Sequence, residues 1–286
     1  MKGMAKFVVE HPVVALLLVL ALTGLAAYQI RNLEIESDML KYLPQDDPDV
    51  QAFNRVGEKF GSNYIALVGL ESDDIFTYET LSTIDKMTEA FEALDEVKQV
   101  NSLTNIIDIK KVEGGLEVAD LIPEVPKDPE ELARLKEYTL SKEMYRNRLV
   151  SEDARYALIM IRLREEANNI EVAKKLKEIS GELAPSYKLY FSGEPMAMEF
   201  ANRLIPDDMK RLMPIIVLVT IIALFMSFGT VRGVVLPLVV VLLALVWVFG
   251  FMATMGFELT IIASLIPVLL IAIGSAYGIH VMSRYY

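Results

Sequence analysis

Ser275, Tyr277 and His280 interrupt an apolar run near the end of this chain of 286 residues, and their types suit proton transfer. Tyr277 and His280 are three positions apart, so a helix places them on one face. Imidazole titrates near neutral pH, and ionisable groups inside a membrane tend to mark ion or substrate routes. We therefore predict that these residues form a proton relay. The alternative is that His280 lies near the end of its helix and reaches the membrane interface.

Small residues recur at a spacing of four along the same run. Gly274 and Gly278 form one such pair, and Ala272 and Ala276 form another. Small side chains allow membrane helices to approach closely, because packing drives helix association in lipid. We expect these four residues to serve helix packing.

The rest of the sequence offers no catalytic constellation. It contains no cysteine, which excludes disulfides, thiolate catalysis and cysteine-based zinc sites. Its two histidines, His11 and His280, lie at opposite ends, so a histidine-rich metal site is not expected. We find no nucleophile–base pair, no glycine-rich phosphate loop and no pair of carboxylates at a spacing that indicates catalysis. The sequence thus predicts no catalytic residue, metal or cofactor, and it disfavours a membrane-anchored hydrolase.

Four long apolar runs position these residues, and each approaches the roughly 20 residues that a helix needs to cross a bilayer. The runs are Val13–Ile30, Leu212–Phe228, Val234–Met255 and Leu259–Val281. We therefore divide the chain into a first membrane helix (1–30), a hydrophilic domain (31–211) and three further membrane helices (212–286). A cleaved signal peptide is the alternative for the first run, but its apolar stretch is longer than a usual signal core.

Charge is concentrated in the hydrophilic domain. Residues 31–211 hold 24 of the 28 basic and 37 of the 39 acidic residues, a net charge of −13. Such an acidic surface argues against nucleic-acid binding. The basic residues that flank the four runs would all lie on one side of the membrane: Lys2, Lys6, Arg232 and Arg284. The positive-inside rule makes that side the cytoplasm, so we predict a multi-pass protein of the inner cell membrane with 31–211 outside.

The hydrophilic domain alternates strand and helix patterns. Helices are predicted over 47–60, 77–94, 129–140 and 170–183, and strands over 64–70, 97–103, 155–163 and 187–191. Without an irregular insert over 105–150, the order is βαββαβ, a ferredoxin-like unit. A helical stretch over 194–211 leads directly into the second apolar run. The predicted fold class is an α+β membrane protein: a four-span helical bundle with an extracytoplasmic ferredoxin-like domain.

The whole chain resembles the first half of a protein of the RND (resistance-nodulation-division) superfamily, in its MMPL-like, hydrophobe/amphiphile exporter branch. One span, a large extracytoplasmic domain and a cluster of spans follow in the order typical of that group. Short motifs support the resemblance: His11-Pro12, Glu34 and Asp38 ahead of Leu43-Pro44 and Asp47-Pro48, Phe60-Gly61, the run Ser192-Gly193-Glu194-Pro195, and the run from Gly274 to His280.

The resemblance implies a porter domain and proton-driven, secondary-active export of lipid-like or amphiphilic molecules. Its implied partners are membrane lipids or amphiphiles, protons, and a second RND half in the same full-length chain or in a partner chain. Family halves usually have six spans, so we expect this chain to be a fragment or to be completed by another polypeptide. Many relatives carry Asp directly before the Tyr, where this chain has Ala276. That departure favours the alternative, a non-pumping lipid-binding, sterol-sensing-like or SecDF-like export-assisting protein.

Overall fold

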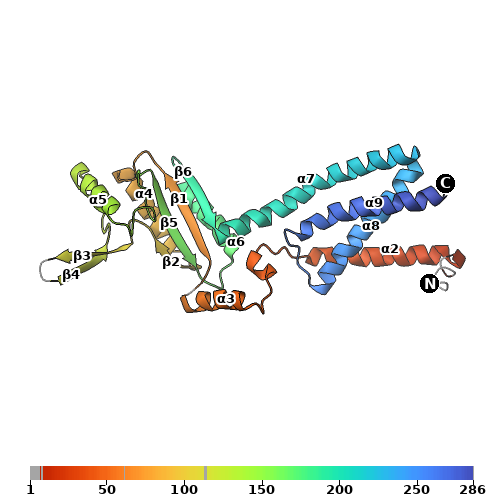
Figure 1. The fold of residues 1–286 in the computed structure, drawn as a ribbon, viewed down its shortest axis with the longest axis horizontal. Helices are drawn as coiled ribbons and strands as arrows, with labels where there is room; N and C mark the ends of the chain where they lie inside the picture. Colours follow the sequence, from red (N-terminus) through yellow and green to blue (C-terminus); the bar gives the residue numbers. More distant parts are fainter. Residues whose placement is uncertain (1–6, 8, 61, 113–114, 286) are drawn as a thin grey trace. The chain divides into compact units, whose positions relative to one another are not determined.

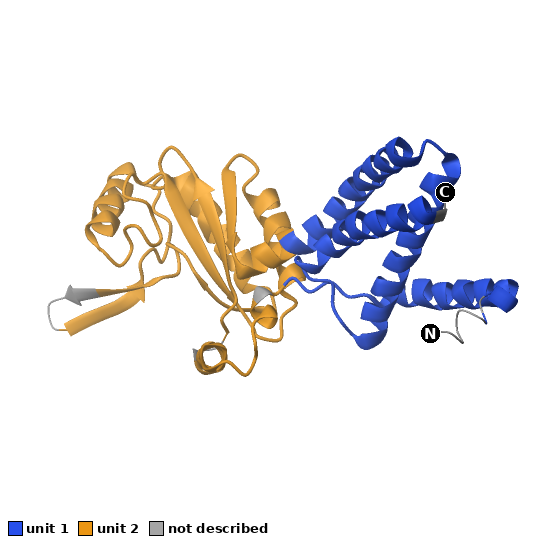
Figure 2. Ribbon diagram, turned by 45° about the vertical axis from the view of Figure 1, so that its right-hand side comes forward, with its two compact units in different colours: residues 1–37, 201–286 blue, residues 38–200 orange. Residues whose placement is uncertain are grey.

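The computed structural model describes residues 7, 9–60, 62–112 and 115–285. Lys2, Lys6 and Gly61, which entered the sequence arguments, lie outside these ranges. The described residues form two compact units, one from 1–37 with 201–286 and the other from 38–200 (Figure 2).

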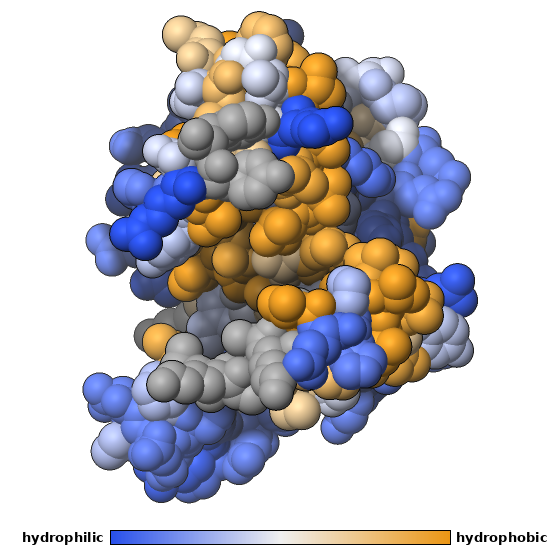
Figure 3. Space-filling model, turned by 90° about the vertical axis from the view of Figure 1, so that its right-hand side faces the viewer, coloured by the Kyte–Doolittle hydropathy of each residue, from blue (hydrophilic) through white to orange (hydrophobic). Residues whose placement is uncertain are grey.

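The first unit contains long apolar helices. Among the described residues, four helices are long and apolar enough to cross a membrane, which confirms the predicted spans. They are α2 (Pro12–Gln29), α7 (Glu194–Phe228), α8 (Val231–Met255) and α9 (Ile266–Tyr285). No residue of α2 is buried although the helix is almost wholly apolar, and apolar residues cover much of the surface shown in Figure 3. Lipid is the solvent in which such exposure is favourable.

The fourth span begins later than the sequence predicted. The apolar run starts at Leu259, but α9 starts at Ile266, after the short 3₁₀ helix η3 (Ala263–Leu265). Pro267 lies in the first turn, where proline lacks no helical hydrogen bond. The preceding Leu259 pairs instead with the segment that follows α2: its amide donates to the Glu34 carbonyl at 2.7 Å, and its carbonyl accepts from the Glu36 amide at 3.2 Å.

The second unit is built on a four-stranded antiparallel sheet in the order β2-β5-β1-β6. The strands are β1 (Ile65–Glu71), β2 (Val97–Asn101), β5 (Tyr156–Leu163) and β6 (Lys188–Gly193). Helices α4 (Tyr78–Glu92) and α6 (Asn169–Leu183) lie on one face of the sheet (Figure 1). Alternate residues of β1 and β5 are buried beneath them, as the period of two in a strand requires. The core residues include Val68, Leu81, Ile84, Phe91, Ile159, Ile161 and Leu176.

The insert between β2 and β5 is more regular than the sequence suggested. Residues 105–150 were expected to be irregular apart from one helix, but they also contain a hairpin of β3 (Ile107–Val112) and β4 (Gly115–Asp120). Aliphatic residues alternate along both strands, and this period of two is the sequence signal from which the hairpin could have been predicted. The expected helix is present as α5 (Pro129–Ser141), and α3 (Pro48–Phe60) and the short η2 (Met39–Tyr42) precede β1.

Candidate functional site

The two glycines of α9 lie against α8. A Cβ added to Gly274 would lie 2.7 Å from Cγ2 of Val241, and one added to Gly278 would lie 2.5 Å from Cβ of Pro237. Both distances are shorter than a real Cβ contact, so glycine allows this close approach. The other predicted packing pair lies elsewhere on the helix, because Ala272 and Ala276 are exposed within the described chain.

An apolar groove of about 580 Å³ runs between α8 and α9. Gly274, Tyr277 and Gly278 line it from α9, and Pro237 and Val241 line it from α8. Tyr277 lies at the rim with 69% of its surface exposed. The groove therefore brings one member of the predicted relay next to the helix-packing glycines.

The other two relay residues are not joined to Tyr277 by hydrogen bonds in the described chain. Ser275 Oγ donates to the Ala272 carbonyl of its own helix at 2.9 Å. His280 is exposed, and its imidazole makes no hydrogen bond to another described residue. The geometry thus leaves Tyr277 and His280 open to groups from outside the described helices.

A second polar cluster lies in the sheet unit. Tyr64 donates a 2.9 Å hydrogen bond to Asp38, whose side chain is 5% exposed and also accepts from the Leu40 amide. Burial, followed by the nearby Asp38 carboxylate, raises the pKa of Glu194. Burial and the bond to Asp38 likewise raise the pKa of Tyr64. Burial and the neighbouring carboxylate therefore both disfavour the charged form of Glu194.

Gly193 fixes the position of this cluster. Its φ is +92°, and a Cβ added there would lie 2.1 Å from the Ile65 carbonyl oxygen. Only glycine tolerates both conditions. β6 ends at this residue and α7 begins at Glu194, so the motif Gly193-Glu194 has a direct geometric role. Asp38 and Glu194 both lie in sequence motifs, but their proximity to Tyr64 depends on tertiary structure and was not predicted.

A buried carboxylate anchors the insert. Asp108 is 4% exposed and accepts hydrogen bonds from Tyr138 at 2.9 Å and from Tyr145 at 2.8 Å. Burial and the bond to Asp108 raise the pKa of both phenols. Because both tyrosines serve as donors to one carboxylate, we assign this cluster to structure.

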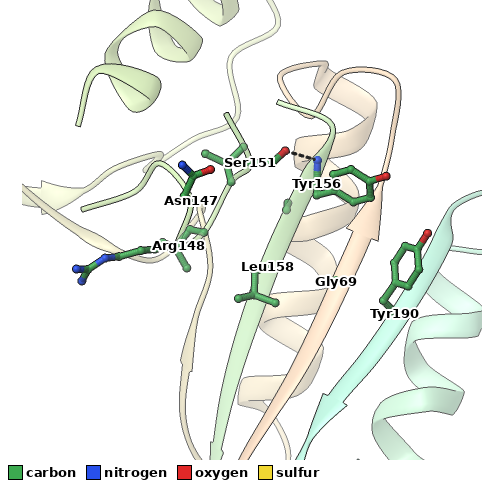
Figure 4. Close-up of a pocket in the computed structure, with 10 residues that line it drawn as sticks. Gly69, Asn147, Arg148, Ser151, Tyr156, Leu158 and Tyr190 are labelled. Carbon is green, nitrogen blue, oxygen red and sulfur yellow. Dashed lines mark hydrogen bonds between the residues drawn. The ribbon is translucent and has the colours of Figure 1, made fainter. Parts of the chain in front are cut away.

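The sheet face that α4 and α6 leave uncovered carries a hollow of about 580 Å³ (Figure 4). Gly69 of β1 contributes no side chain there, and Leu158 and Tyr190 flank it on the neighbouring strands. The rings of Tyr156 and Tyr190 are 6.3 Å apart and tilted by 58°. The lining of this shallow hollow thus combines aromatic and aliphatic side chains with the polar Asn147, Arg148 and Ser151. No group of three or more potential metal ligands occurs among the residues that the structure describes.

Comparison with known proteins adds a family. The model of the MMPL family matches residues 41–286. A curated protein of Methanocaldococcus jannaschii, whose name proposes only that it is a membrane protein, is 23% identical over 308 aligned residues. That alignment covers 100% of this chain and 74% of the relative. The similarity therefore spans the membrane helices and the sheet unit alike.

Proposed function

This chain belongs to the MMPL family, a family of membrane transporters, and from that premise we propose that it forms the N-terminal half of a proton-driven exporter of lipid-like or amphiphilic molecules. The observation that carries the proposal is the arrangement of a sheet unit between the first and second of four apolar helices, within a chain that the family model matches over 41–286. The absence of catalytic constellations from the sequence agrees with a transporter.

The sheet unit is proposed to be the porter domain. Its strand order and its helices on one face support the proposal of a ferredoxin-like unit. The hollow at Gly69 and the tyrosines beside it offer the amphiphile an apolar surface with polar edges. Alternating access requires two repeats that move against each other. We therefore propose a second RND half as the partner, and we expect residues 1–286 alone to bind substrate without transporting it.

Proton coupling is proposed to involve Tyr277 and His280, with Ser275 beside them. One charge that moves through 100 mV supplies about 2.3 kcal/mol, enough to shift the populations of two states. Ala276 stands where many family members have a carboxylate, so the imidazole of His280 or a group of the second half must hold the proton. Tyr277 would orient it from the rim of the α8–α9 groove.

The test is transport by the full-length protein in proteoliposomes under an imposed proton gradient, with a fluorescent lipid as substrate. His280→Ala and Tyr277→Phe should each reduce gradient-dependent transport at least tenfold. His11→Ala and Tyr28→Phe, which change the same residue types at the first span, are the matched controls and should transport normally. Unchanged coupling in both test variants would remove Tyr277 and His280 from the mechanism.

A second function is favoured by Ala276, because a chain without that carboxylate need not pump. It is a non-pumping lipid-binding or sterol-sensing-like protein, or a SecDF-like helper of protein export. Lipid binding that is unaffected by the gradient, together with no gradient-driven transport by the full-length protein, would favour it over export.

We also propose that the protein lies in the inner cell membrane with its N-terminus in the cytoplasm and residues 31–211 outside. The chain has no native cysteine, so one introduced at the exposed Glu124 reports on a single site. In intact cells it should react with a membrane-impermeant maleimide, whereas tags before α2 and after α9 should be protected. Protection of the cysteine, or exposure of either tag, would reverse the assignment.

A further inference from the structure

The packing of α8 against α9 sets a register that can be followed to the end of both helices. Val241 lies opposite Gly274, and Pro237 lies opposite Gly278, so four residues back along α8 correspond to four residues forward along α9. The same register, continued, pairs Arg232 of α8 with Ser283 of α9, one residue before Arg284. The two arginines therefore lie at the same end of the helix pair.

Both arginines continue the stripes of side chains that line the groove. Arg232 is one turn before Leu236, and Arg284 is three residues after Val281, and both of these apolar residues line the groove. Residues three or four apart share a face of a helix. The register and the helix faces thus put two guanidinium-bearing residues at one mouth of the groove.

The charge of these arginines has no counterion within the described chain. Neither residue forms an ion pair with another described residue, and both are exposed. The sequence contains no Asp or Glu in 231–257 or in 259–286. An anion from outside the chain would therefore meet two unopposed positive charges, and guanidinium groups suit phosphate oxygens through paired hydrogen bonds.

The groove itself has the chemistry and the length of one lipid leaflet. Its lining is almost entirely aliphatic, from Leu236 to Ala244 on α8. The eight steps from Leu236 to Ala244 rise about 12 Å, close to the roughly 15 Å of hydrocarbon in one half of a bilayer. Its volume of about 580 Å³ accommodates an extended hydrocarbon chain, and its lining reaches Leu236 and Met282, the lining residues nearest the two arginines in sequence.

We propose that α8 and α9 hold one anionic phospholipid, with an acyl chain in the groove and its phosphate between Arg232 and Arg284. The occupant follows from three observations: the groove is apolar, its helices are long and apolar enough to cross a membrane, and the two arginines near its end have no counterion within the described chain. The site does not depend on transport, so a protein that only binds or senses lipids would carry it as well.

The experiment measures lipid retained by the purified protein in native mass spectrometry, with phosphatidylglycerol and phosphatidylcholine of identical acyl chains. The wild type should retain phosphatidylglycerol preferentially. Each basic residue near a membrane surface contributes about fivefold to the binding of anionic lipid. Arg232→Gln and Arg284→Gln should therefore each lower the preference about fivefold, and the double variant about 25-fold.

Two further variants separate the effect of the arginine charges from the effect of the apolar groove, and they control for misfolding. Val240→Phe fills the groove but keeps both arginines, so it should reduce phosphatidylglycerol retention without changing net charge. The double Arg→Lys variant keeps the flanking charge that orients the spans, and it should retain most of the preference. Arg211→Gln, which removes an arginine that does not line the groove, is the control and should behave as wild type.

Several results would overturn the proposal. Equal retention of the two lipids, or an unchanged preference in the double Arg→Gln variant, would mean that the arginines do not select the headgroup. Normal retention by Val240→Phe would mean that no acyl chain enters the groove. Full competition by water-soluble glycerol phosphate would reduce the site to a phosphate site without a lipid. A protein helix seated on the groove, shown by loss of all lipid when the second half is present, would also exclude a bound lipid.

Discussion

Removing the Asp108 carboxylate should loosen the insert of the sheet unit more than removing either phenol that donates to it. Asp108→Ala deletes the acceptor of two hydrogen bonds, at 2.8 Å from Tyr145 and 2.9 Å from Tyr138. Tyr145 is fully buried, so its hydroxyl would be left without a good acceptor or water. Tyr138 is only partly buried and can turn toward solvent.

The magnitude follows from these differences in burial. A hydrogen bond to a charged group contributes about 1.5–3 kcal/mol, and a stranded buried donor costs about 1–3 kcal/mol. We expect Asp108→Ala to destabilise the insert by about 3–5 kcal/mol and Tyr145→Phe by about 1.5–3 kcal/mol. The double variant should be no less stable than Asp108→Ala alone, because the phenylalanine removes the stranded hydroxyl.

The assay uses the absence of cysteine from the chain. Thr139 is fully buried on α5 and its hydroxyl has no hydrogen-bond partner among the described residues, so Thr139→Cys places a thiol there with little disturbance. In detergent, the rate of thiol labelling then reports how often the insert opens. Asp108→Ala should raise the rate at least 10²-fold, since each 1.4 kcal/mol corresponds to about tenfold. A rise below threefold, or full additivity in the double variant, would refute the reasoning.

Three further predictions concern single residues. Burial and Asp38 raise the pKa of Glu194 above its ordinary 4.5, so the folded state binds that proton more tightly and loses stability as pH rises. Glu194→Gln should therefore raise the melting temperature at pH 7, with the gain vanishing below pH 4.5; an equal gain at all pH values would contradict this. Gly193→Ala should destabilise the sheet unit by at least about 1–2 kcal/mol in thermal melts, whereas Gly181→Ala, in open space on α6, should not. A Cβ on Gly250 would lie 2.6 Å from the Ala26 carbonyl oxygen, so Gly250→Leu should separate α2 from α8. Crosslinking between cysteines at Thr23 and Trp247, which are hydrogen-bonded at 2.8 Å, should then fall at least tenfold, and unchanged crosslinking would show that the helices stay together.

Elements with a strong local signal could be predicted from the sequence. The run Ile65–Leu70 is apolar without interruption and forms the buried central strand β1, and α4 follows a helical pattern from its Thr77 cap. The four spans follow from length and hydrophobicity alone. In each case the physical cause acts within one segment, so the sequence contains it.

Features that depend on contacts between distant segments were missed. The hydrogen bond from Tyr64 to Asp38 joins residues 26 positions apart, and neither residue type marks the contact. Helix α9 starts at Ile266 and not at the predicted Leu259, because the backbone of Leu259 forms hydrogen bonds with the segment after α2 instead of continuing a helix. The hairpin of β3 and β4 escaped notice because its charged residues obscured the alternation of Ile107, Ile109, Leu116 and Val118.

The two prolines of α7 give this long helix a mechanical character of its own. Pro206 and Pro214 supply no amide hydrogen, so the carbonyls of Asn202 and Lys210 lack their helical donors. Bending is cheapest at these two turns. Ile205, Met209 and Met213 of the same stretch pack into the core of α8 and α9. The stiffness of α7 therefore depends on its neighbours. Packing against α8 and α9 keeps the helix straight at the two prolines, and loss of that packing would allow it to bend there.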